Sequence, residues 1–82
     1  MKDPELEAYV AAIERHFGRR RGREHVLAPP EFDLARQWFT AGLALATVLT
    51  GIDEAFGAGA APVALTFCRR HVEALTKPAR RD

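Results

Sequence analysis

The sequence predicts an all-α fold, a compact bundle-like or orthogonal array of about four short helices that forms a single domain over residues 1–82. Two observations support this fold class. Four segments carry apolar residues at helical spacing, and prolines or glycines stand at their boundaries. No segment alternates apolar and polar residues as a half-buried strand does.

The first helix is expected over residues 4–17. Asp3 suits the N-cap, and Pro4 suits the first helical position, where no amide hydrogen is needed. An apolar stripe follows, formed by Leu6, Tyr9, Val10, Ile13 and Phe17. Gly18 is expected to cap the end of this helix. A basic connector then covers residues 18–29.

Two further helices are expected on either side of Gly42. Pro29 and Pro30 introduce the second, which should run from Glu31 to Thr40 or Ala41. The third should run over residues 44–56, with a stripe of Leu45, Val48, Leu49, Ile52 and Phe56. Gly51 lies inside it, where glycine costs up to about 1 kcal/mol relative to alanine. A closely packed neighbouring helix would account for this glycine.

The last part of the chain is expected to contain one more helix. A Gly/Ala loop covers residues 57–61, and Pro62 then opens a helix that extends to about Thr76. Its apolar stripe consists of Leu65, Cys68, Val72 and Leu75, and Phe67 flanks it. A charged tail over residues 77–82 follows Pro78.

A set of residues spread over most of the chain forms a pattern: Tyr9, Ile13-Glu14, Phe17, Arg20-Arg21-Gly22, Pro30, Phe32, Trp38, Ala41-Gly42, Leu45, Val48-Leu49, Gly51-Ile52, Ala55-Phe56, Leu65, Phe67-Cys68 and Val72. This pattern resembles a region of uncharacterised bacterial proteins and implies relatives rather than a mechanism. The positions Pro30, Trp38, Leu45, Val48 and Ile52 are also similar to the C-terminal domain of DnaD-type primosomal replication proteins. That similarity implies a replication-accessory role, although the aromatic-rich C-terminal motif of that family is missing.

The helices around Gly42 have the outline of a helix-turn-helix, a DNA-binding motif. Val48 follows Gly42 at the spacing that the motif requires, but Trp38 is too large for the close approach of the two helices before the turn. The outward positions of residues 44–56 include no Lys or Arg, which commonly read base edges. We therefore expect an antiparallel helix pair at the packing centre of the domain.

The formal net charge is +1, so no overall field favours nucleic acid or a membrane. Positive charge is instead concentrated in two segments, whose basic residues are Arg19, Arg20, Arg21 and Arg23, and Arg69, Arg70, Lys77, Arg80 and Arg81. If the segments share one face, they form a basic patch that could hold a phosphate backbone or an acidic protein surface. Otherwise they serve only to keep a small domain in solution.

No catalytic site, metal site or cofactor is expected. Cys68 is the only cysteine, which excludes an internal disulfide and a multi-cysteine metal site. Cys68 and His71 are one helical turn apart, but a structural zinc site needs four ligands, and Cys68 fits the apolar stripe. His16 and His25 belong to no recognisable catalytic motif. The absence of a signal-like or membrane-spanning run predicts a cytoplasmic protein.

The preferred hypothesis is a non-enzymatic helical protein-interaction module. The chain has many large aromatic side chains for its length, and Leu34, Trp38 and Phe39 are the candidate surface for a protein partner or a homo-oligomer. The alternative is nucleic-acid binding through Arg19–Arg23 and Arg69–Arg81.

Overall fold

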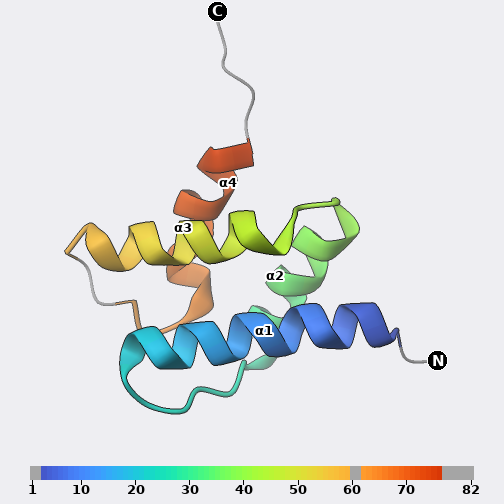
Figure 1. Ribbon diagram of the computed structural model, residues 1–82, viewed down its shortest axis with the longest axis horizontal. Coiled ribbons are helices and arrows are strands. Elements are labelled where there is room, and N and C mark those ends of the chain that lie inside the picture. The colour runs from blue at the N-terminus through green and yellow to red at the C-terminus, as the bar shows by residue number, and fades with distance from the viewer. Residues whose placement is uncertain (1–2, 60–61, 77–82) are drawn as a thin grey trace, which may run out of the picture.

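The computed structural model describes residues 3–59 and 62–76, and it confirms an all-α fold. These residues form four α-helices and one 3₁₀ turn, with no strand among them: α1 (Pro4–Arg21), α2 (Pro29–Thr40), α3 (Leu45–Gly57), η1 (Leu65–Cys68) and α4 (Arg69–Thr76). α1 and α3 lie side by side and run in the same direction, whereas α4 crosses α3 steeply (Figure 1). The helices thus form an orthogonal array.

α1 begins where the sequence indicates and ends about one turn later than expected. Asp3 is the N-cap, and its carboxylate accepts backbone hydrogen bonds of 3.0 and 3.3 Å from the first turn. The prediction that Gly18 ends the helix is wrong. The helix continues to Arg21 and is capped by Gly22, whose φ of +78° suits a residue without a side chain. Three arginines assigned to the connector over residues 18–29 are therefore helical: Arg19, Arg20 and Arg21.

α2 and α3 agree closely with their expected ranges, and Gly42 provides the break between them. α2 begins at Pro29 rather than at Glu31, because both prolines fit the first helical turn. Gly42 has a φ of +85°, and its amide donates a 3.0 Å hydrogen bond to the carbonyl of Phe39. The amide of Leu43 donates a second hydrogen bond, also of 3.0 Å, to the carbonyl of Trp38 in the last turn of α2.

The packing of α2 and α3 differs from the expectation. They do not form the close antiparallel pair predicted at the packing centre: α3 packs mainly against α4 and α1, and α2 packs against α1 and η1. Gly51 is the point of close approach between α3 and α4, as its position inside the helix suggested. The core draws on all five elements and contains Tyr9, Val10, Ile13, Phe17, Leu34, Ala35, Trp38, Val48, Ile52, Ala55, Leu65, Cys68 and Val72.

The prediction of one continuous helix from Pro62 is wrong. Ala64 is extended, with φ −150° and ψ 155°, and helical structure begins only at Leu65. The reason is a long-range contact, because the amide of Leu65 donates a 2.6 Å hydrogen bond to the carboxylate of Glu31. Part of the predicted Gly/Ala loop (60–61) and the predicted charged tail (77–82) lie outside the described residues. In the described ranges, no helix has the length and apolar character needed to cross a membrane.

Candidate functional site

The aromatic surface proposed for α2 is mostly inside the protein. Leu34 is 4% exposed and Trp38 is 3% exposed. The indole Nε1 of Trp38 donates a 3.2 Å hydrogen bond to Glu73 of α4. Phe39 is half-buried and packs edge-on against Tyr9, with ring centroids 5.2 Å apart. Leu34 and Trp38 are therefore core residues, and the prediction that they belong to a partner surface is corrected.

Two of the four arginines in the last turn of α1 and just after its cap are engaged in holding the fold. Arg20 lies 3.4 Å from the carboxylate of Asp53 on α3, and its guanidinium stacks 5.3 Å from the ring centroid of Phe56. Arg21 contacts the imidazole of His25 at 3.2 Å. The other two, Arg19 and Arg23, are exposed and form no ion pair with any residue in the described ranges.

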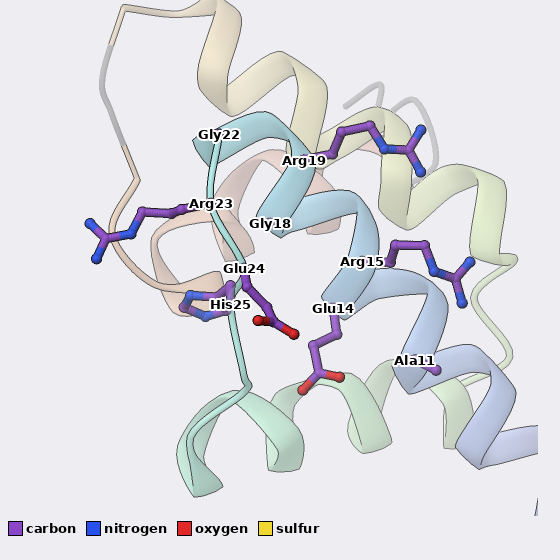
Figure 2. Close-up of a pocket in the computed structure, with 9 residues that line it drawn as sticks. All are labelled: Ala11, Glu14, Arg15, Gly18, Arg19, Gly22, Arg23, Glu24 and His25. Carbon is purple, nitrogen blue, oxygen red and sulfur yellow. The ribbon is translucent and has the colours of Figure 1, made fainter.

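Arg19 and Arg23 border an open hollow of about 620 Å³ between α1 and the connector. Glu14 and Glu24 turn toward this hollow, whereas the arginine side chains extend away from it (Figure 2). A phosphate cradle needs converging donors, and here the converging groups are carboxylates. The connector hollow therefore does not have the form of an anion site.

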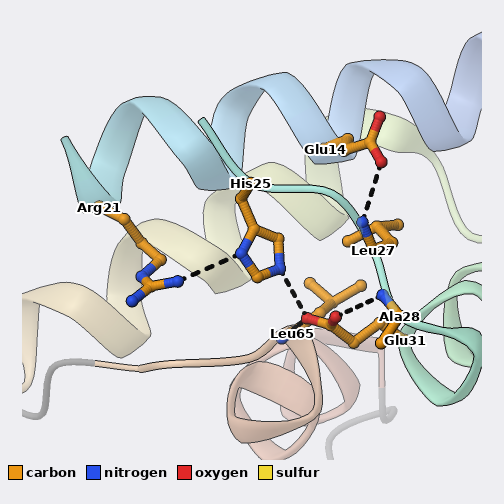
Figure 3. A network of polar contacts seen from close by, with 7 residues as sticks. All are labelled: Glu14, Arg21, His25, Leu27, Ala28, Glu31 and Leu65. Carbon is orange, nitrogen blue, oxygen red and sulfur yellow. Dashed lines mark hydrogen bonds and ion pairs between the residues drawn. The ribbon is translucent and has the colours of Figure 1, made fainter. Parts of the chain in front are cut away.

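A buried polar network joins three parts of the chain beneath the connector (Figure 3). Its centre is Glu31, which is only 4% exposed. One carboxylate oxygen accepts from the amide of Ala28 at 2.7 Å. The other accepts from the amide of Leu65 at 2.6 Å and from Nε2 of His25 at 2.9 Å. The network therefore connects the connector, α2 and η1.

The charge state of this network follows from its donors. Burial by itself would raise the pKa of Glu31, but the hydrogen bonds from the Ala28 and Leu65 amides and from His25 outweigh burial and lower that pKa. On its other side, Nδ1 of His25 lies 3.2 Å from the guanidinium of Arg21, so His25 stands between a cation and a carboxylate.

Sequence reasoning missed the role of Glu31, which it named only as the first residue of the second expected helix. A local signal was present, because a glutamate at the third position of a helix commonly bonds back to the N-cap amide. The contact with Leu65 has no local signal, because the two residues are far apart in the chain.

The residues considered for metal or nucleophilic chemistry lie apart. Cys68 is completely buried, and burial together with the charge of Glu31 raises its pKa to about 12, which disfavours the reactive thiolate. His71 is only half-buried and faces a different surface. His16 bonds to Asp53 at 2.8 Å and helps to hold α1 against α3. Among the described residues, no group of three or more His, Cys, Asp or Glu side chains could hold a metal ion.

The larger hollow, about 780 Å³, lies along the final helix, and we call it the α4 groove. It is lined by Thr66, Phe67, Arg69, Arg70, His71, Glu73 and Ala74. Phe67 is 63% exposed, although it is one of the largest apolar side chains in the protein. A weak signal for this exposure was present in the sequence, because Phe67 lies beside the apolar stripe rather than in it.

The structure does not gather the two basic segments around one site. Arg19 and Arg23 border the connector hollow, whereas Arg69 and Arg70 line the α4 groove. Lys77, Arg80 and Arg81 lie outside the described residues. Among the described residues, the basic side chains border two different hollows, and the single basic patch stays a prediction because three of its residues are not described.

No known protein family matches this chain, and neither a curated protein nor a solved structure shows significant similarity to it. Arguments about function therefore depend on the residues themselves.

Proposed function

We propose that this chain is a non-enzymatic helical interaction module that binds a protein partner through the α4 groove. The observation that carries the proposal is the exposure of Phe67 in a groove that also contains Arg69 and Arg70. The proposed partner surface therefore lies on η1 and α4, and not on α2, where Leu34 and Trp38 are buried.

The exposed ring of Phe67 can supply binding energy. Burying a phenylalanine side chain contributes about 1.5–3 kcal/mol, and this contribution is mostly unused in the isolated domain. Aromatic residues and arginines are also enriched at the energetic centres of protein interfaces. The α4 groove offers both residue types, Phe67 from η1 and the arginines from α4, and the buried side chains of Leu65, Cys68 and Val72 hold these two elements in the core.

The proposal can be tested with a pair of matched variants. Phe67→Ala removes the exposed ring of the groove, and Val26→Ala removes an even more exposed apolar side chain on the connector. In affinity capture from the native host, the partner should be retained by the wild type and by Val26→Ala and lost by Phe67→Ala. Capture that is identical for all three proteins would contradict the proposal.

Self-association is a special case in which the partner is a second copy. Light scattering coupled to size exclusion should then give a mass above 9.1 kDa that depends on concentration and falls to the monomer value in Phe67→Ala. A monomer at every concentration would direct the search to a different partner.

The alternative function is nucleic-acid binding, as in a replication-accessory protein. It is supported by Phe67 beside Arg70, because exposed aromatic rings stack on bases and arginines hold phosphates. Fluorescence anisotropy with labelled single-stranded and duplex oligonucleotides at low salt tests it. This function requires binding that weakens steeply with salt and weakens further in Phe67→Ala. An anisotropy that does not change when the protein is added at low salt would exclude nucleic-acid binding.

A further inference from the structure

We infer that the partner segment of the α4 groove is acidic as well as apolar, with a carboxylate about one helical turn from an apolar anchor. This inference rests on the proposed function and adds the chemistry of the partner.

The groove contains one ion pair and one further arginine. Arg69 and Glu73 neutralise each other, since Nε of Arg69 lies 3.1 Å from the Glu73 carboxylate. The same carboxylate oxygen accepts from Nε1 of Trp38 at 3.2 Å, which holds Glu73 against the core. Glu73 is therefore oriented toward Arg69 and Trp38.

Arg70 supplies the unbalanced charge. Its side chain is exposed, lines the groove and has no ion pair within the part of the chain that the structure describes. A guanidinium binds a carboxylate through two parallel hydrogen bonds, and this pairing is stronger than a neutral hydrogen bond. The best complement to Arg70 is therefore an Asp or Glu side chain of the partner.

The spacing of the partner's residues follows from the helix. Phe67 in η1 and Arg70 in the first turn of α4 are three positions apart, a spacing that places two residues on the same side of a 3₁₀ or α-helical turn, and both line the groove. The partner must therefore carry an apolar side chain that covers Phe67 and a carboxylate that meets Arg70. These two partner residues must be about as close to each other as Phe67 and Arg70 are. Residues three or four apart on a partner helix satisfy this condition.

The test is selection of a displayed random-peptide library on the immobilised full-length chain. Wild type, Phe67→Ala and Arg70→Glu are compared with Arg15→Glu, which reverses an exposed arginine that borders the connector hollow instead. Peptides selected on the wild type should be enriched in Asp or Glu three or four positions from Leu, Ile or Phe. Their affinity should fall about tenfold or more for Arg70→Glu, and should be unchanged for Arg15→Glu.

The outcomes separate the two claims. Peptides that need Phe67 but show no acidic enrichment would overturn the inference and leave the proposed function in place. If every selected peptide binds the wild type and Phe67→Ala equally well, the proposed function itself is overturned. Oligonucleotide binding that depends on both Phe67 and Arg70 would overturn the inference, because the ligand of the α4 groove would then be a nucleic acid and not an acidic peptide. Circular dichroism on each variant establishes that the exposed substitutions leave the fold intact.

Discussion

Val72 of α4 lies directly on Gly51 of α3, so closely that a side chain at position 51 has no room. A Cβ atom built on Gly51 would be 2.5 Å from Cγ2 of Val72 and 2.6 Å from its Cα. The second neighbour is backbone, which no change of rotamer can move. The contact therefore fixes the distance at which α4 crosses α3.

Gly51→Ala should destabilise the protein by about 1–3 kcal/mol or more, because α4 must move away from α3 to admit the methyl group. Gly57→Ala is the matched control in the same helix, since nothing lies within 4 Å of a Cβ built there. The control should be neutral or more stable by up to about 1 kcal/mol, as alanine favours helix. Urea unfolding followed by circular dichroism gives both values. Equal stability of the two variants would contradict the packing argument.

Glu31→Gln should lower the free energy of unfolding by about 1–3 kcal/mol at neutral pH. The amide nitrogen of glutamine cannot accept a hydrogen bond, so at least one of the donors that face Glu31 loses its partner. Glu54→Gln, at an exposed position of α3, should change stability little. Chemical denaturation compares the two, and a loss of the same size in both would count against the network.

Acidification should weaken the fold through the same residue. The pKa of Glu31 lies below its ordinary value of 4.5 in the folded chain, so the unfolded chain binds the proton more readily. The carboxylate therefore stabilises the fold fully above that ordinary value and loses this contribution as the pH falls toward the folded pKa. The urea midpoint should drop as the pH falls below about 5, and it should drop less in Glu31→Gln. Parallel curves for the two proteins would show that other groups cause the loss.

Cys68 should resist alkylation in the folded protein. It is completely buried, and burial with the nearby charge of Glu31 raises its pKa to about 12, so both access and thiolate are lacking near neutral pH. Mass spectrometry after iodoacetamide treatment should show almost no adduct without denaturant and complete modification in guanidinium chloride. Rapid modification of the native protein would mean that the thiol is accessible.

Tyr9→Phe should lower the free energy of unfolding by about 1 kcal/mol. The hydroxyl of Tyr9 donates a 3.0 Å hydrogen bond to the carbonyl of Leu43, which ties α1 to the turn before α3.

Burial also raises the pKa of Tyr9 to about 12. Since Tyr9 is the only tyrosine, the absorbance of the phenolate in a pH titration reports directly on the ionisation of its hydroxyl. Ionisation near pH 10 without unfolding would show that the hydroxyl is open to solvent.

The local features of the fold could be predicted from the sequence. The apolar stripes, the Asp3 cap and the break at Gly42 depend on residues that are close in the chain, and α2 and α3 lie near their expected ranges. Gly18 illustrates the limit of this reasoning, because a helix end depends on which glycine adopts the left-handed conformation. Gly22 adopts it, so α1 continues through Gly18.

The candidate surface depended on contacts that local patterns do not contain. Trp38 and Phe39 are adjacent, and their spacing alone does not tell which of them a later helix covers. Glu73 of α4 binds Trp38, so the residue that seemed available for a partner belongs to the core. Conversely, Phe67 is exposed because Leu65 and Cys68 are the residues of η1 that face the core, and the turn places Phe67 on its other side.

The bond between Glu31 and Leu65 has a consequence for how this domain tolerates changes in length. The starting point of the final helix is set by a side chain of α2 rather than by the chain that immediately precedes it. Residues inserted after Gly59, which is exposed, would lengthen the route to η1 without rotating the faces of α4. Closing a longer loop adds only about 0.6 kcal/mol for each doubling of its length. The junction between α3 and η1 is thus a place where a tag or a second domain could be inserted while the α4 groove keeps its orientation.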